Sequence, residues 1–288
     1  MAQRTPVRNA VRRLRRKRPV VEFGAVPAIT IESADDERVA DYMGLRERDP
    51  DATPDYFIAE SELVVRRLIT SQYKVKSFLV SPGRYERMRD VLDAERAPTY
   101  IAEHDILRGI AGYELHRGVL AAGRRRPSRT LPDIAITARR LLVLEGVNDA
   151  ENIGAVARSA RALGFDALVL DPTCADAFSR RAIRVSMGEI LHLAVVRGSK
   201  WPEPLDYLNR IGFETWALTP DPDATNLFEM GMPPKLALVA GAEGSGLTAE
   251  ALARTQFTVR IPMHHNVDSL NIGHALAIAM AATSPAVS

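Results

Sequence analysis

The chain has 288 residues, enough for two domains of ordinary size, and its 46% apolar content is sufficient for hydrophobic cores, which excludes disorder throughout. A single cysteine, Cys174, excludes an internal disulfide framework and a multi-cysteine metal cage, and we predict a plain loop or core position for it. No apolar run approaches the ~20 residues that a membrane span needs, and the N-terminus lacks the apolar core of a secretory signal. We therefore expect no membrane association and a cytoplasmic location.

The net charge of +2 conceals an uneven distribution. Residues 1–18 contain eight Arg or Lys and no acid, so the rest of the chain holds 30 of the 38 basic residues and all 36 acidic ones. We predict a basic arm over residues 1–24. This arm either binds nucleic-acid phosphates in a salt-dependent way or is a solvated tail without a partner.

Short β-rich runs alternate with helical periodicity through the first half of the chain. Strands are predicted over residues 27–31, 56–59, 75–80 and 99–102, and helices over residues 61–71 and 85–94. The pattern indicates a small α/β domain over residues 25–122. Over residues 123–138, Gly, Arg, Pro and Ser replace the apolar periodicity, which predicts a basic linker and a domain boundary.

The second half continues the alternation with longer helices between the strands. Strands are predicted over residues 141–147, 167–170, 193–196, 215–218, 236–240 and 258–261. Thr248 is the expected N-cap of a helix that ends near Arg254, and an apolar, Ala-rich helix is expected over residues 270–282. This order predicts an α/β domain with a parallel sheet and crossover helices.

Three clusters of small and polar residues lie at the ends of these strands. Residues 152–158 read NIGAVAR, residues 241–247 read GAEGSGL, and the third cluster consists of IPM at 261–263 with SLN at 269–271. Small residues let a ligand approach the backbone, and exposed amides hold polar atoms, so a ligand site is expected here. Neither a Walker A sequence nor a dinucleotide-binding glycine fingerprint is present, which removes support for ATP hydrolysis and for NAD.

Together the three clusters resemble the motifs of the SpoU-type (TrmH-like) RNA ribose 2′-O-methyltransferases of the SPOUT superfamily. The resemblance covers residues 139–283 well and the first half loosely. It implies a catalytic domain over residues 139–288 with a deep trefoil knot. It also implies that residues 25–122 form a small substrate-binding domain similar to the ribosomal L30e-like fold.

The resemblance further implies that S-adenosyl-L-methionine is held by the second and third motifs. Gly241, Ile261 and Leu270 would line the bent cofactor, with Leu218 and Met263 beside them. Outside this context Ile261 and Leu270 would be ordinary core residues, and Gly241 a turn residue.

In the family, the arginine of the first motif acts on the acceptor ribose, and Arg158 occupies that position here. Arginine presents donors only, so we assign Arg158 to stabilising the developing oxyanion and gripping the adjacent phosphate, not to general-base action. Asn152 either caps its helix or orients Arg158, and Glu243 orients Asn152, Arg158 or the ribose. Ser269 and Asn271 either bind acceptor or cofactor, or cap the last helix.

Other candidate groups lie outside these motifs. His264 and His265 would point to opposite sides of an extended segment, so no shared metal and no metal site are expected. His274 is a candidate proton acceptor or a dimer-interface residue. Residues 180–188, which also resemble the family, are a candidate phosphate contact or a surface helix face.

The resemblance implies a homodimer that transfers a methyl group to a ribose 2′-hydroxyl of structured RNA, with ribosomal RNA favoured over transfer RNA. Two alternatives stay open. One is a non-catalytic RNA-binding scaffold with the same fold, and the other is an enzyme of that fold that methylates a base.

Overall fold

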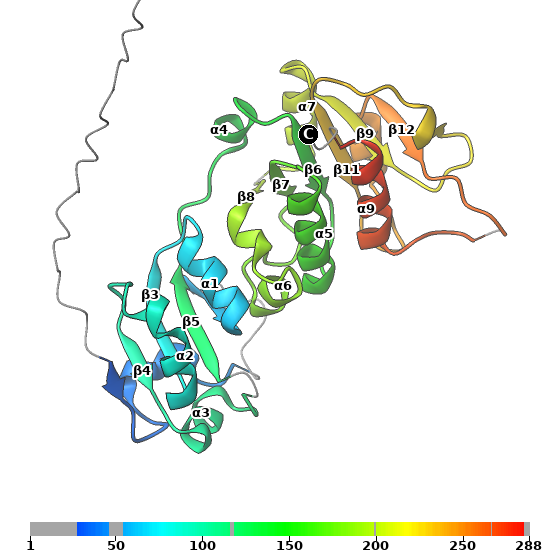
Figure 1. The fold of residues 1–288 in the computed structure, drawn as a ribbon. Coiled ribbons are helices and arrows are strands. Elements are labelled where there is room, and N and C mark those ends of the chain that lie inside the picture. The colour runs from blue at the N-terminus through cyan, green and yellow to red at the C-terminus, as the bar shows by residue number, and fades with distance from the viewer. Residues whose placement is uncertain (1–27, 46–53, 116–117, 199, 266, 285–288) are drawn as a thin grey trace, which may run out of the picture.

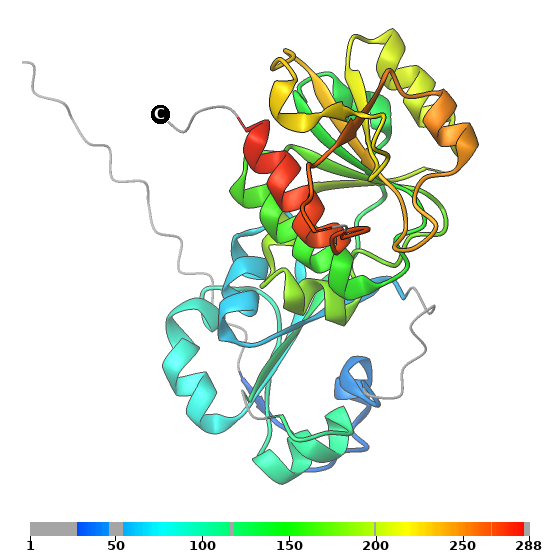
Figure 2. The same cartoon turned by 90° about the vertical axis from the view of Figure 1, so that its right-hand side faces the viewer.

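The computed structural model describes residues 28–45, 54–115, 118–198, 200–265 and 267–284, which form two α/β lobes (Figures 1 and 2). The N-terminal lobe comprises the described residues up to 124, the C-terminal lobe begins at residue 131, and residues 125–130 form the connecting segment. The predicted basic arm lies outside the described residues. Within the described part of the chain, no helix combines the length and apolar character needed to cross a bilayer.

Five strands in the described part of the N-terminal lobe form one mixed sheet in the order β1-β4-β3-β5-β2. The first three pair in parallel, and β5 runs antiparallel to β3 and β2. The strands are β1 (Ile29–Thr30), β2 (Tyr56–Glu60), β3 (Val75–Val80), β4 (Thr99–Ile101) and β5 (Val119–Arg124). The helices are the 3₁₀ helix η1 (Glu37–Tyr42), α1 (Glu62–Thr70), α2 (Pro82–Leu92) and α3 (His104–Ala111).

The structure corrects the predicted linker at both of its ends. Gly123 and Arg124 belong to β5, where they pair with Phe57 and Tyr56 of β2. Residues 131–135 form α4 (Leu131–Ala135), which begins with a reciprocal capping box between Thr130 and Asp133. β5 was not predicted from the sequence, because Ala and Gly have weak strand propensity. Burial between β2 and β3 stabilises this strand.

Seven strands in the described part of the C-terminal lobe form a parallel sheet in the order β10-β12-β9-β11-β6-β7-β8. They are β6 (Arg140–Leu144), β7 (Ala167–Leu170), β8 (Ala194–Arg197), β9 (Glu214–Leu218), β10 (Thr225–Asn226), β11 (Leu236–Ala240) and β12 (Phe257–Arg260). The six predicted strands are confirmed, although the first ends at Leu144 and not at residue 147, and β10 is an addition. Its two residues are too few to carry a periodic signal.

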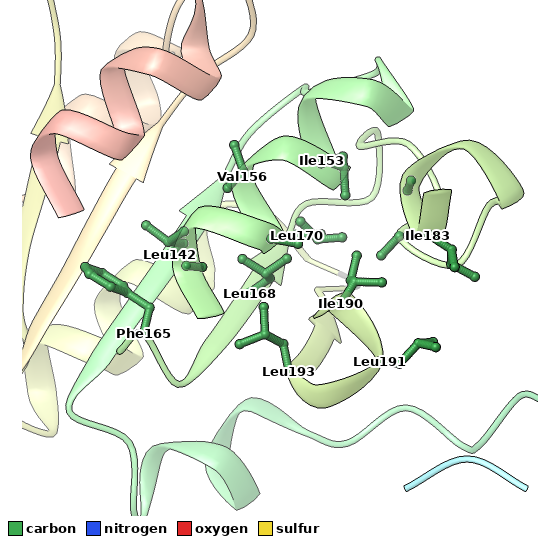
Figure 3. Packing of buried hydrophobic residues seen from close by; sticks show 14 of the residues in the cluster. Leu142, Ile153, Val156, Phe165, Leu168, Leu170, Ile183, Ile190, Leu191 and Leu193 are labelled. Carbon is green, nitrogen blue, oxygen red and sulfur yellow. The ribbon is translucent and has the colours of Figure 1, made fainter. Parts of the chain in front are cut away.

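Helices cover both faces of this sheet, which explains why its strands are almost continuously apolar. Leu142 and Leu144 of β6 face the core that contains α5 (Ala150–Ala162), α6 (Arg180–Val185), η2 (Glu189–His192) and α9 (Ile272–Ala282). Figure 3 shows part of this core, in which Ile153 and Val156 of α5 lie in one cluster with Leu142, Leu168 and Leu170 of β6 and β7. Leu141 and Val143 face the opposite core, which contains α4, α7 (Glu203–Arg210) and α8 (Ala249–Ala253). The 3₁₀ helix η3 (Leu227–Glu229) lies next to α9.

Ion pairs and a shared core join the two lobes. Arg67 of α1 pairs with Glu189 at 2.7 Å and donates to the Met187 carbonyl at 2.7 Å. Arg180 of α6 pairs with Glu60 of β2 at 3.1 Å. Arg180 belongs to the segment 180–188, which was a candidate phosphate contact or surface helix face, and in the structure its side chain pairs with Glu60. The lobes therefore hold a defined relative position.

Candidate functional site

A cavity of about 470 Å³ opens at the carboxyl ends of β9, β11 and β12. The segments that follow these strands form its walls. They include all five residues predicted to line a cofactor, namely Leu218, Gly241, Ile261, Met263 and Leu270. Ser269 and Asn271 also line the cavity. The structure thus brings together residues that lie more than 50 positions apart in the sequence, at the edge where parallel α/β sheets usually bind ligands.

The glycine-rich loop after β11 turns back closely upon itself. The Gly246 amide donates to the Ala242 carbonyl at 3.0 Å, and Gly244 and Gly246 have φ values of +87° and +68°. A Cβ placed on Gly241 would lie 2.1 Å from the carbonyl carbon and oxygen of Gly246. Only glycine fits at position 241, and the loop presents its backbone to the cavity.

Polar side chains from the three motifs meet at the mouth of this cavity. Glu243 Oε1 accepts hydrogen bonds from Asn152 Nδ2 at 3.2 Å and from Asn271 Nδ2 at 2.6 Å. Asn271 Nδ2 also donates to Asn152 Oδ1 at 3.2 Å. We call these three residues the amide–carboxylate cluster. It connects the first turn of α5, the glycine-rich loop and the start of α9.

The structure resolves two of the capping alternatives. Asn152 does not cap α5, because Asp149 is the N-cap and accepts from the Glu151 amide at 2.8 Å. Asn271 does cap α9, since its Oδ1 accepts from the Gly273 amide at 2.9 Å. Its Nδ2 donates to the other two residues of the cluster. Ser269 is exposed on the cavity wall and has no hydrogen bond to another described residue.

Arg158 lies apart from the cavity wall, on the exposed side of α5. It lies six positions after Asn152, which corresponds to about 9 Å along the helix axis. Its guanidinium makes no hydrogen bond or ion pair with any described residue. The structure therefore leaves Arg158 available to an anionic group from outside this chain. It does not place the residue within the cavity.

Glu145 is a site residue that the sequence did not identify. It is buried directly after β6, where its carboxylate accepts from the Thr248 amide at 2.9 Å, from Thr248 Oγ1 at 2.8 Å and from Trp201 Nε1. Thr248 ends the glycine-rich loop and caps α8. Glu145 thus fixes the far end of that loop. The sequence feature that could have identified Glu145 is its position, as an acidic residue immediately after an apolar strand.

The remaining candidate groups lie outside the cavity wall. His264 and His265 are exposed, with ring centroids 6.2 Å apart, and His274 is exposed on α9. Among the described residues, no group of three or more His, Cys, Asp or Glu side chains is arranged to hold a metal ion. Cys174 is a buried core residue as predicted, and its thiol donates to the Leu144 carbonyl at 3.4 Å. Burial raises the pKa of this thiol to about 12.

Comparisons with known proteins agree with the three motifs. The SpoU rRNA Methylase family matches residues 139–281. An uncharacterised tRNA/rRNA methyltransferase of Mycobacterium tuberculosis is 40% identical over 252 residues, which cover 85% of this chain and 88% of that relative. The 23S rRNA (guanosine(2553)-2′-O)-methyltransferase RlmP of Bacillus subtilis is 30% identical over 249 residues, or 86% of this chain and 96% of that protein.

Solved structures share the fold over both lobes. The SpoU methyltransferase AviRb of Streptomyces viridochromogenes, in complex with AdoMet, superimposes with a TM-score of 0.75 at 20% identity, covering 86% of this chain and 97% of that one. An RNA 2′-O ribose methyltransferase superimposes with a TM-score of 0.72 at 27% identity, covering 89% and 98% of the two chains. From its motifs, its relatives and its fold, the chain belongs to the SpoU family of RNA methyltransferases.

Proposed function

We propose that this chain transfers the methyl group of S-adenosyl-L-methionine to a ribose 2′-hydroxyl of structured RNA in the cytoplasm, with ribosomal RNA favoured over transfer RNA. The observation that carries the proposal is the convergence of Asn152, Glu243 and Asn271 at a cavity lined by the predicted cofactor residues. By their names, RlmP methylates a guanosine 2′-oxygen of 23S rRNA and AviRb binds AdoMet, which supports both the acceptor and the donor.

The cavity suits this cofactor in its shape and chemistry. Leu218, Ile261 and Leu270 provide an apolar surface for an adenine ring, and the backbone of the glycine-rich loop provides amides and carbonyls for its polar edge. When bound, the cofactor supplies a sulfonium methyl group, which is an intrinsically good electrophile. The chain must then position the acceptor and exclude water, and alignment of this kind contributes much of the rate enhancement.

The amide–carboxylate cluster is the positioning device in this proposal. Two amides hold Glu243 Oε1, so the carboxylate has a fixed orientation. No described residue donates a hydrogen bond to Glu243 Oε2, which is left to accept one from the acceptor ribose. Ser269 offers a hydroxyl on the same wall.

Arg158 stabilises the negative charge that develops on the ribose 2′-oxygen and binds the adjacent phosphate of the RNA. Because it lies about 9 Å along α5 from Asn152, we propose that it acts at the cavity of a second copy in a homodimer. Exposed apolar side chains support such an interface: Phe228 is 63% exposed and Ile278 36% exposed. Their elements η3 and α9 are in contact, and α9 packs beside α5 (Figure 1).

Two structural expectations accompany this function. We propose that the second and third motifs, residues 241–247 with 261–263 and 269–271, belong to a deep trefoil knot, an arrangement that is rare among proteins and supported here by the family. We also propose that the N-terminal lobe is an L30e-like RNA-binding domain. Its contact with the catalytic lobe through Arg67 and Arg180 supports a fixed substrate-binding role.

Calorimetric titration with S-adenosyl-L-methionine and S-adenosylhomocysteine tests the cofactor, and one site per chain is expected for each. Transfer from labelled cofactor to ribosomal RNA, followed by mass spectrometry of the digested nucleosides, tests the acceptor. Ribose-methylated nucleosides would support the proposal, whereas base-methylated ones would favour the base-methylating alternative. RNA binding without cofactor binding would favour a non-catalytic scaffold.

A further inference from the structure

A second cavity, of about 590 Å³, lies between the two lobes. Tyr73 of the N-terminal lobe and Arg125 and Arg126 of the connecting segment line one side, and Phe178 and Arg197 of the C-terminal lobe line the other. We infer that this cavity binds one nucleotide of the RNA substrate, distinct from the nucleotide that is methylated. This inference rests on the proposed function, because it assigns a second subsite for the same RNA.

The interior of the cavity suits a nucleobase. Leu170, Ala175 and Val195 contribute apolar surface, and the rings of Tyr73 and Phe178 have centroids 5.3 Å apart. Both rings are half-buried, so they are held in place while one part of each faces the cavity. Proteins recognise unstacked RNA bases by packing them against aromatic and guanidinium planes, and pockets for small ligands measure roughly 300–1,000 Å³.

Two arginines build the wall of this cavity. Arg125 pairs with Asp176, and its guanidinium lies 5.6 Å from the centroid of the Phe178 ring. Arg197 donates to the carbonyls of Cys174 and Ala175, each at 2.8 Å, so it fixes the loop that follows β7. Within the part of the chain that the structure describes, no carboxylate pairs with Arg197. Three arginines and one carboxylate, that of Asp176, therefore line the cavity, which makes it electropositive.

Two further residues at the rim remain available to a ligand. Arg126 is exposed and uses only Nη1, which donates to the Gln72 side chain at 3.0 Å and to the Gln72 carbonyl at 3.3 Å. Its Nε and Nη2 have no acceptor among the described residues, and they match the geometry of a phosphate. Asn148 is exposed on the same rim, and its amide has no described partner. An amide of this kind can donate to and accept from a base edge.

The position of this cavity relates it to the reaction site. It lies at the carboxyl ends of β7 and β8, and the cofactor cavity lies at the carboxyl ends of β9, β11 and β12 in the same parallel sheet. Asn148 of the second cavity and Asn152 of the amide–carboxylate cluster are four residues apart around the start of α5. One RNA segment can therefore occupy both cavities, and the fixed lobes set the spacing between them. Arg125 and Arg126 then contribute to selectivity, beyond the unspecific affinity expected from a basic linker.

Nucleotide binding by the full-length protein tests this inference. Adenosine, guanosine, cytidine and uridine 5′-monophosphates are each titrated calorimetrically into protein saturated with S-adenosylhomocysteine, which occupies the cofactor cavity. We expect one nucleotide site per chain, with affinities that differ among the bases. Arg126→Ala and Asn148→Ala should each weaken binding about tenfold, as the loss of a hydrogen bond to a charged group or a buried base edge does.

Arg129→Ala is the matched control for Arg126→Ala. Arg129 lies in the same connecting segment and is exposed, but it does not line the cavity, so its removal changes the net charge equally. Equal losses in Arg126→Ala and Arg129→Ala would overturn the inference, because general electrostatics would then explain the binding. Absence of binding by all four nucleotides would overturn it as well.

Two additional measurements complete the test. One distinguishes a site for RNA from a site for free nucleotides, and the other distinguishes failure of this inference from failure of the proposed methyl transfer. A single-stranded RNA oligomer should displace the bound mononucleotide; a mononucleotide that no RNA displaces would show a site for free nucleotide and contradict the inference. With ribosomal RNA as substrate, Asn148→Ala should raise KM and leave kcat nearly unchanged. Failure of S-adenosylhomocysteine to bind is measured separately and contradicts the proposed methyl transfer, not the nucleotide site.

Discussion

At the scale of single residues, Glu243 and Gly241 have different roles in the glycine-rich loop over residues 241–247. Glu243 needs a fixed carboxylate, which the amides of Asn152 and Asn271 supply from distant parts of the sequence. Gly241 needs the absence of a side chain, because the Gly246 backbone occupies that space. The same loop thus combines a carboxylate held by two amides with a tightly folded backbone.

Removal of the Arg158 guanidinium is expected to separate cofactor binding from catalysis. Arg158→Ala should leave the affinity for S-adenosyl-L-methionine near normal, since the residue lies outside the cavity wall. Methyl transfer should fall by roughly 10²–10³-fold, as it does when one donor to a developing oxyanion is lost. Calorimetry and transfer assays on the same preparation check this. Weakened cofactor binding with retained turnover would contradict the assigned role.

Addition of a methyl group at position 241 is expected to disrupt the cofactor cavity. In Gly241→Ala the new Cβ would meet the Gly246 carbonyl at 2.1 Å, so the loop must move. We expect cofactor affinity to fall at least about tenfold, because the displaced backbone no longer shapes the cavity. Gly231→Ala is the control, since no atom lies within 4 Å of its Cβ position. Similar cofactor affinity in the two variants would refute the steric argument.

The Cys174 thiol gives a prediction about pH. Burial raises its pKa from 9.0 to about 12, so the folded state favours the neutral thiol. This contribution to stability is present below pH 9 and is lost as the pH rises from about 9 to about 12. Iodoacetamide should therefore alkylate the native protein slowly at pH 8.5 and the urea-unfolded protein quickly. Equal rates in the two states would show that the thiol is not buried.

At the scale of elements, the cavity depends on how β6, α8 and α9 are tied to the glycine-rich loop. Asn271 both caps α9 and binds Glu243, so the start of this helix and the loop are fixed together. Glu145, directly after β6, accepts hydrogen bonds from Thr248, the N-cap of α8, and so fixes the start of α8 to the other end of the loop. The loop is therefore held at both ends by side chains that begin or end an element.

Replacement of the Glu145 carboxylate tests this connection. In Glu145→Gln, an amide NH₂ replaces one of the carboxylate oxygens that accept from Trp201 Nε1, the Thr248 amide and Thr248 Oγ1. Because this NH₂ cannot accept, at least one buried hydrogen bond is lost. We expect the free energy of unfolding to fall by about 1–3 kcal/mol. Urea denaturation measures this, with the exposed Glu203→Gln as the control. Cofactor affinity should fall in parallel, and an unchanged affinity in a destabilised Glu145→Gln protein would show that the loop does not depend on this contact.

At the scale of the whole molecule, the two lobes are in direct contact. Arg67 and Arg180 cross between them to Glu189 and Glu60, and the apolar core continues from α1 into α6 and η2. This continuity gives the interlobe cavity fixed walls. It also leaves the apolar residues of η3 and α9 on the outer side of the C-terminal lobe, where the proposed second copy would bind.

A charge placed on that surface is expected to prevent dimerisation. Ile278→Asp introduces a carboxylate into the proposed interface, where burial without a partner is strongly unfavourable. Light scattering after size-exclusion chromatography should show a dimer for the unaltered protein and a monomer for this variant. Ile136→Asp is the control, because Ile136 is 78% exposed at the end of α4, away from η3 and α9. A monomeric unaltered protein would contradict the homodimer.

Relatedness to the SpoU family and the strands of the catalytic lobe were predictable from the sequence, because both depend on local features. The apolar runs at 167–170 and 236–240 carry a strand signal of their own, and each of the three motifs spans only a short stretch of sequence. The capping of α8 by Thr248 was predictable for the same reason. Local propensity therefore predicted most of the strands, and the resemblance of the three motifs indicated the family and the residues that line the first cavity.

Only the tertiary structure decided the features that depend on contacts between distant residues. β5 forms because β2 and β3 bury a segment rich in Ala and Gly, and Arg180 pairs with Glu60 across 120 positions. The burial of Glu145, the place of Arg158 outside the cavity and the second cavity between the lobes follow from the same kind of contact. A sequence pattern records neighbours along the chain, whereas these features are set by which elements pack together.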